Sequence, residues 1–344
     1  MGRRLTPLFL LAALVAGSIS TSASAGSSRP SWAQAEIRLV TSRGLMGGNA
    51  ASFRPQDPLT RLALEKLVAG LTRKPLPTNI VDGSATVTMQ QLDARLVRAL
   101  GLSRAAGTFR RGAADAGLRV PSRFGNEAAA RLLSLRKNHP AKQDMLELLP
   151  TDPATRAEAA YSAARILKFS GWEVANVKRA ATTFSLPTLN PWQKRVLTTG
   201  FGFVGFPYVW GGTSERAQAP FGLETTGGFD CSGFIWRVYK LHAYPGGRKL
   251  AGVLRGRTTF TMSAEVPRSK RITASRLQPG DVVFFGARGP RSKPAEVDHS
   301  GIYVGNGWLV HSSSAGVALA QMSGWYKERF AWGRRPLAEA GLGG

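Results

Sequence analysis

The chain contains a single cysteine, and the residues around it are those of a nucleophile. Cys231 stands in the stretch GGFDCSGFIW, directly after Asp230 and before a Ser-Gly pair. Aspartate is a good helix N-cap and apolar residues follow at helical spacing, so we expect Cys231 in the first turn of a buried helix. The positive end of a helix favours a thiolate, and its free N–H groups stabilise an oxyanion. This placement predicts a thiol that attacks an amide.

A cysteine nucleophile needs a general base, and the chain has four histidines. His139 lies in the first half of the chain, in a polar stretch typical of a surface. His242 follows the predicted cysteine helix, about 16 Å from the thiol at 1.5 Å per residue. The stretch DHSGIYVGNGWLVHSS predicts two strands joined by a turn at 305–307. His299 begins the first strand and His311 ends the second, so a hairpin brings base and orienting residue together.

The elements around this candidate site fill the second half of the chain. We expect a helix from Pro191, capped by the preceding asparagine, then an aromatic loop FPYVWGG, the cysteine helix, and a strand over 281–286. The motifs PYVWGG, FDCSGF, LQPGDVVFF, DHSGIYVGNG and LVHSSSAGV follow one another over residues 191–344. Together they closely resemble the NlpC-type cell-wall cysteine peptidases. The resemblance implies an α+β papain-like fold with an antiparallel sheet.

The resemblance also implies a role for each matching residue. In the catalytic set, Cys231 is the nucleophile, His299 the general base and His311 the residue that orients the base. The substrate-binding set is a tyrosine beside the thiol and two residues that hold the amino end of the peptide, namely Tyr208, Asp230 and Ser232. Members of the family typically cut the bond between D-glutamate and a diamino acid in peptidoglycan stem peptides. No cofactor is expected, and no HExxH motif or cysteine cluster predicts a metal site.

Two departures from the family pattern leave the bond and the reaction open. One is a long polar stretch over 213–226, and the other is a basic insert ahead of Asp298. An N-acetylmuramoyl-L-alanine amidase or an acyltransferase on the same fold would use the same three catalytic residues. A non-catalytic cell-wall-binding protein is the alternative from another class.

The first half of the chain contains a repeat. RPQDPLTR at 54–61 recurs as LPTDPATR at 149–156, and a helical pattern follows each copy. Thr155 and the glutamate three positions later have the spacing of a capping box, which marks a helix start. A weaker third copy begins at Thr88, also with this spacing. Between the copies, 101–125 is rich in Gly, Ala and Arg and is expected to be an irregular surface segment.

The repeat resembles the S-layer homology repeat, which implies an all-α wall-binding domain over 26–183, joined by a linker at 184–190. In that family the arginine of the TRAE-type helix start lies in a groove that binds anionic secondary wall polymers. Arg61 and Arg156 are then the candidate polymer ligands. The structural alternative is that both arginines are solvated residues beside helix caps.

The start of the chain and its charge agree with work in the cell envelope. Residues 1–25 combine two arginines, a short apolar run and an Ala-Ser-Ala end, the pattern of a signal peptide. We therefore expect a secreted, cell-wall-associated protein with no integral membrane segment once the signal is removed. The net charge of +25 is spread nearly equally over both halves and fits a polyanionic wall. A nucleic-acid partner is suggested by the charge alone, and the export signal argues against it.

Overall fold

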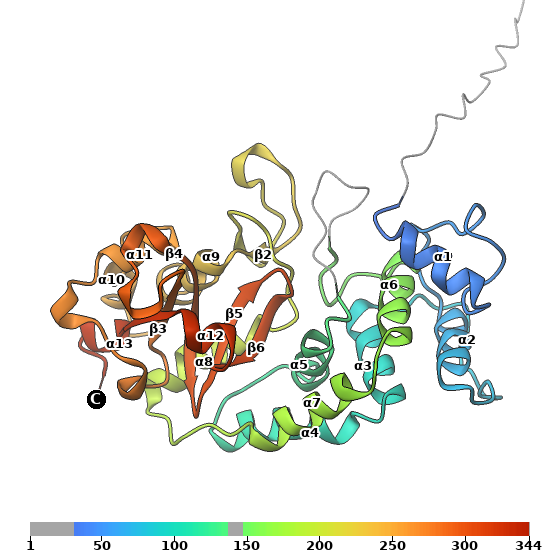
Figure 1. Ribbon diagram of the computed structural model, residues 1–344, viewed down its shortest axis with the longest axis horizontal. Coiled ribbons are helices and arrows are strands. Elements are labelled where there is room, and N and C mark those ends of the chain that lie inside the picture. Colours follow the sequence, from blue (N-terminus) through green and yellow to red (C-terminus); the bar gives the residue numbers. More distant parts are fainter. Residues whose placement is uncertain (1–30, 137–146, 344) are drawn as a thin grey trace, which may run out of the picture. The chain divides into compact units, whose positions relative to one another are not determined.

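The computed structural model describes residues 31–136 and 147–343 (Figure 1). The expected signal peptide at 1–25 and His139 lie outside the described residues. From Ser31 onward the chain forms one compact unit. In the described ranges, no helix is both long enough and apolar enough to cross a bilayer.

The first half is helical. Its helices are α1 (Gln34–Ser42), α2 (Arg61–Thr72), α3 (Met89–Ala99), α4 (Ser103–Asp115), α5 (Phe124–Leu132), α6 (Arg156–Leu167) and α7 (Trp172–Thr183). The three predicted repeat starts are confirmed, because Thr60, Thr88 and Thr155 are the N-caps of α2, α3 and α6. The Thr155 hydroxyl accepts the N–H of Glu158 at 3.3 Å, and the Gln91 side chain accepts the N–H of Thr88 at 2.7 Å.

The three helix starts meet in a closed ring of backbone hydrogen bonds. The N–H of Leu59 donates to the carbonyl of Ala154 at 2.7 Å, that of Ala154 to Val87 at 2.8 Å, and that of Val87 back to Leu59 at 3.0 Å. Each segment therefore donates to one neighbour and accepts from the other. The weak middle copy occupies the same structural position as the two clear ones.

The expectation of an irregular surface segment over 101–125 is wrong. This stretch contains helix α4, which buries four apolar residues, Ala105, Ala106, Phe109 and Ala113. Its small residues serve close packing, since a Cβ at Gly125 on α5 would collide with the backbone of Ala106. Gly and Ala at helical spacing here indicate two tightly packed helices, not a loop.

The second half surrounds a five-stranded sheet. Its helices are α8 (Pro191–Gly202), α9 (Cys231–Trp236, continued by a π-turn over Arg237–Leu241), α10 (Leu250–Val253), α11 (Thr259–Ala264), α12 (Trp325–Arg329) and α13 (Pro336–Glu339). Its strands are β1 (Thr213–Ser214), β2 (Gly228–Phe229), β3 (Val282–Gly286), β4 (Val297–Gly305), β5 (Trp308–Ser313), β6 (Gly316–Gln321) and β7 (Phe330–Arg334). The sheet is antiparallel in the order β6-β5-β4-β3-β7, while β1 and β2 pair separately.

The sheet holds the cysteine helix on one side and an aromatic cluster on the other. Helix α9 packs against β4 and β5 with Phe234 and Ile235 fully buried. The opposite cluster includes Phe285 of β3, with Tyr326 of α12 packed against it. The predicted hairpin of β4 and β5, with its turn at 305–307, is confirmed.

The predicted linker at 184–190 is itself packed. Phe184 and Leu189 are buried. The ring of Phe184 lies edge-on to Phe109 of α4, at 5.3 Å between centroids, and to Trp308 of β5, at 5.2 Å. One hydrophobic core therefore runs from the helical half into the sheet half.

Candidate active site

Cys231 stands in the first turn of α9, as its sequence context predicts. The carboxylate of Asp230 caps the helix by accepting the N–H of Gly233 at 2.5 Å. Burial raises the pKa of the Cys231 thiol to about 11, and the charge of Asp230 adds to this, while Ser232 and Ser300 oppose it through hydrogen bonds. The thiol is therefore neutral at pH 7, because burial and the charge of Asp230 outweigh the hydrogen bonds that favour the thiolate.

His299 and His311 lie in contact at the end of the β4–β5 hairpin. The Nε2 of His299 is 2.9 Å from the Nδ1 of His311, and the Nε2 of His311 is 3.1 Å from the hydroxyl of Tyr326. Burial lowers the pKa of His299 to about 4, which Asp298 opposes and Arg329 reinforces. Burial and the neighbouring His299 hold the pKa of His311 well below its usual value. Both imidazoles are neutral at pH 7.

One cavity of about 640 Å³ joins the thiol to the first histidine. Its lining includes five of the six residues predicted for catalysis and peptide binding, Tyr208, Asp230, Cys231, Ser232 and His299. His311 does not line it and stands behind His299. Burial raises the pKa of Tyr208, and so do the nearby Cys231 and Asp230, so its phenol is a neutral donor at the cavity wall. In the described ranges, no cluster of His, Cys, Asp and Glu could hold a metal ion.

This half of the chain matches the model of the NlpC/P60 family over residues 205–335. Residues 205–335 are an NlpC/P60 domain. Residues 26–63 match the S-layer homology domain, which covers the first repeat start.

Several curated proteins are similar to part of this chain, among them the following three. "Probable peptidoglycan endopeptidase LytE" of Bacillus subtilis is 32% identical, over 41% of this chain and 34% of that protein. "Gamma-D-glutamyl-L-lysine dipeptidyl-peptidase" of the same species is 29% identical, over 36% and 33%. "Murein DD-endopeptidase MepH" of Escherichia coli is 33% identical, over 38% and 41%. The chain thus spans well under half the length of each.

Within the NlpC/P60 domain, the carboxylate of Asp230 is already surrounded by donors. It accepts the N–H of Gly211 at 2.9 Å, the Ser232 hydroxyl at 3.1 Å, and two N–H groups of Arg257, both at 3.2 Å. Arg257 also donates to the Ser232 hydroxyl at 2.7 Å. Asp230 and Ser232, at the start of the cysteine helix, are therefore hydrogen-bonded to Arg257 in the cavity wall. Sequence reasoning missed this arginine, and its place before the helix N-cap Thr258 was the available signal.

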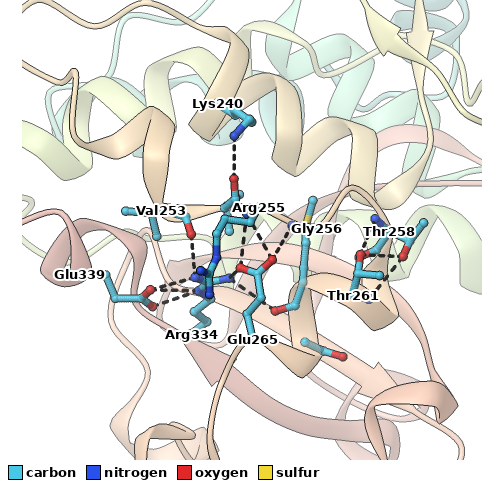
Figure 2. A network of polar contacts seen from close by, with 12 residues as sticks. Lys240, Val253, Arg255, Gly256, Thr258, Thr261, Glu265, Arg334 and Glu339 are labelled. Carbon is cyan, nitrogen blue, oxygen red and sulfur yellow. Dashed lines mark hydrogen bonds and ion pairs between the residues drawn. The ribbon is translucent and has the colours of Figure 1, made fainter.

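A buried ion network fixes the segment that carries Arg257 (Figure 2). Arg334 of β7 donates to Glu265 at 2.7 Å and to the carbonyl of Val253 at 2.9 Å. Glu265 in turn accepts the backbone N–H groups of Arg255, at 3.2 Å, and of Gly256. Arg255 and Gly256 are the two residues before Arg257. Through Glu265, the edge strand β7 therefore holds Arg257 at the cavity.

The two arginines predicted to bind a polymer have different surroundings. Arg61 lines two neighbouring cavities of about 420 and 350 Å³ together with Arg95 and Arg98. Arg156 lines neither. It donates to the carbonyls of Phe53 at 2.8 Å and Met46 at 3.2 Å, with its guanidinium over the Phe53 ring at 4.5 Å.

Proposed function

We propose that this protein is a secreted peptidoglycan hydrolase that cuts an amide bond in cell-wall stem peptides by a thiol mechanism. The observation that supports it most is the shared cavity of Cys231 and His299, with His311 bonded to the far side of His299. A nucleophile, a base and a group that orients the base are the arrangement typical of thiol catalysis. The names of two relatives, which specify peptidoglycan and murein, support the substrate class.

The contacts of the histidines define how the proton would move. His299 uses Nε2 toward His311, which leaves Nδ1 to accept the thiol proton. Nδ1 is free to accept only if Nε2 carries the hydrogen and donates it to the Nδ1 of His311. The Nε2–H of His311 then donates to the oxygen of Tyr326. These hydrogen bonds thereby hold both histidines in the one tautomer that catalysis needs.

The reaction starts from a neutral thiol and a neutral imidazole. As the Cys231 sulfur attacks the peptide carbonyl carbon, its proton passes to His299, and the backbone N–H groups at the start of α9 face the developing oxyanion. His299 then gives the proton to the leaving amine, and an acyl-enzyme remains. Water, deprotonated by His299, releases the acyl group and restores the thiol.

We place the cut between D-glutamate and the diamino acid, as the family resemblance implies. The name of the B. subtilis dipeptidyl-peptidase supports this bond, and that of the E. coli relative offers a second one, the D,D cross-link. Digestion of purified peptidoglycan with the full chain, followed by mass spectrometry, separates the options. The proposed cut leaves the sugar with L-Ala-D-Glu, an amidase frees the whole stem from the sugar, and a D,D cut only opens cross-links.

Two further arms complete this experiment. In H₂¹⁸O, hydrolysis places one ¹⁸O in the new carboxyl group, whereas acyl transfer to an amine places none. Cys231→Ala should release nothing while retaining the unfolding midpoint of the wild type. Undiminished release by that variant would refute the thiol mechanism, and no release by the wild type would favour a non-catalytic wall-binding protein.

We also propose that the helical half binds the wall. It would extend over 26–183, after a signal peptide at 1–25, and be joined through 184–190 to a catalytic domain over 191–344. The cavities lined by Arg61, Arg95 and Arg98 support an anionic polymer as ligand, since they carry three guanidinium groups against one carboxylate, that of Glu65, which is paired with Arg95 at 2.7 Å. Binding of this kind raises the local concentration of substrate.

A further inference from the structure

Helix α5 of the helical half contacts strand β6 of the sheet half and carries a buried arginine. Arg131 is only 2% exposed. Its Nη1 donates to the carbonyl of Ala315 at 2.7 Å, and its Nη2 donates to the carbonyl of Gly205. A Cβ at Gly316 would lie 2.6 Å from the same Nη1, so the turn fits closely over the guanidinium. One side chain thus holds two separate segments of the NlpC/P60 domain.

Both segments lead directly to walls of the catalytic cavity. Ala315 lies in the β5–β6 turn, immediately after Ser313 and Ser314, which line the cavity. Gly205 stands three residues before Tyr208, which also lines it. The two segments are bonded to each other as well, since Gly205 donates to the carbonyl of Val317 at 2.9 Å.

A third cavity segment reaches the same place through the ion partner of Arg131. Glu147 lies 2.8 Å from Arg131 and is 3% exposed. The hydroxyl of Thr226 lies 3.3 Å from the backbone carbonyl of Glu147 and 3.2 Å from that of Gly227, and it donates between the two. Thr226 ends the polar stretch that supplies Phe221 to the cavity, and it stands five residues before the first residue of the cysteine helix. Arg131 and Glu147 therefore form one buried pair that faces three cavity-forming segments.

We propose that Arg131 is a positioning residue of the peptidase, through which the helical half sets the spacing of the walls that receive the stem peptide. This inference rests on the function proposed above. The guanidinium suits the task because its planar fork donates in two directions while its charge is matched by Glu147. A lysine has a single ammonium and cannot hold both carbonyls at the same positions. His299 lies on β4, and His311 lies on β5 four residues before Ala315. The test therefore needs a readout of the thiol that is independent of substrate binding.

The test compares Arg131→Lys with Arg136→Lys. Arg136 is equally buried and ion-paired, at 3.1 Å to Asp93 and 3.6 Å to Glu147, and it donates to the carbonyl of Leu148 at 2.7 Å. These partners all belong to the helical half. Both changes should lower the unfolding midpoint. Only Arg131→Lys should raise the KM for a soluble L-Ala-D-Glu-diamino acid tripeptide, by about tenfold, because displaced walls lose substrate contacts.

Two readouts separate positioning from general damage. Alkylation of Cys231 by iodoacetamide, which needs only the thiol, should stay within twofold of the wild type in Arg131→Lys. Calorimetric binding of the tripeptide in a Cys231→Ala background should weaken about tenfold with Arg131→Lys and not with Arg136→Lys. Equal effects of both changes on binding would overturn the positioning role. Absent turnover with intact binding would contradict only the proposed reaction.

A milder pair of variants covers the case in which Arg131→Lys does not fold. Thr226→Val removes the hydroxyl bond to Glu147. Its control, Thr198→Val, removes another contact between the halves, the bond from the N–H of Arg119 at 3.4 Å, which lies away from the cavity. Thr226→Val should weaken tripeptide binding about threefold and Thr198→Val should leave it unchanged. Unchanged binding in both would also count against the proposal.

Discussion

The pKa of Cys231 gives a direct test of the resting state of the site. Burial raises that pKa to about 11, against about 8.5 for a free cysteine. At pH 7 the thiolate then makes up about one molecule in ten thousand, compared with about 3% for a free thiol. Because the thiolate is the reactive form, iodoacetamide should alkylate Cys231 roughly 300 times more slowly than glutathione at pH 7.

The pH profile of alkylation distinguishes a neutral pair from an ion pair. With a neutral thiol and imidazole, the rate should rise about tenfold per pH unit from pH 6 until it levels off near pH 11. An imidazolium-thiolate pair would instead give a fast plateau that begins near pH 5. The assay is mass spectrometry of the intact protein, and the chain's single cysteine makes the added mass unambiguous.

His299→Ala serves as the control for this interpretation. In the neutral pair His299 does not hold the thiol ionised, so its removal should leave the shape of the alkylation profile unchanged even though peptide cleavage stops. A plateau below pH 8 in the wild type that disappears in His299→Ala would refute the reasoning. The thiolate would then be present before substrate binds, as the helix-start argument from sequence expected.

Three further predictions concern other residues. Burial and the neighbouring Asp93 hold the pKa of Glu127 above its usual value, although three nearby arginines oppose this. The wild type should therefore lose stability as pH rises from 5 to 9, and Glu127→Gln should flatten that slope in urea unfolding. His299→Ala should lower kcat/KM at least about a thousandfold and His311→Ala less, since the base moves the proton and the orienter only directs it; the reverse order in steady-state assays would exchange the two roles. Arg61→Ala should weaken pelleting with cell walls and flatten the salt dependence of pelleting. Arg156→Ala should instead lower the unfolding midpoint. Equal pelleting curves for Arg61→Ala and wild type would assign wall binding to general charge.

Local patterns in the sequence predicted the parts of the fold and site that depend on neighbours along the chain. The N-cap at Asp230, the threonine caps of the repeats and the β4–β5 hairpin each follow from a few adjacent residues. The contact of His299 with His311 follows from the hairpin, because its turn sets which residues meet at the open end. These features are fixed by backbone geometry and need no knowledge of distant segments.

Features that depend on residues far apart in the chain were not predictable in this way. Tyr326 reaches His311 from a short helix after β6, and no local pattern marks it as part of the site. Arg257 joins Asp230 from 27 positions away. The sequence argument also expected a lowered pKa for Cys231, and this was wrong. The pKa is raised because the water removed from a helix start depends on every segment packed around it.

A protonated thiol also affects how fast the site is oxidised. Peroxides, like alkylating agents, react with the thiolate, so the burial that slows alkylation of Cys231 slows its oxidation by the same factor. In return, the thiolate is not formed in advance, and the thiol proton has to leave during the attack itself. His299 is suited to this step, because its lowered pKa keeps it an acceptor at every pH above about 4. The cation that then forms is buried, which makes the acceptor nitrogen of His311 more important in the transition state than at rest.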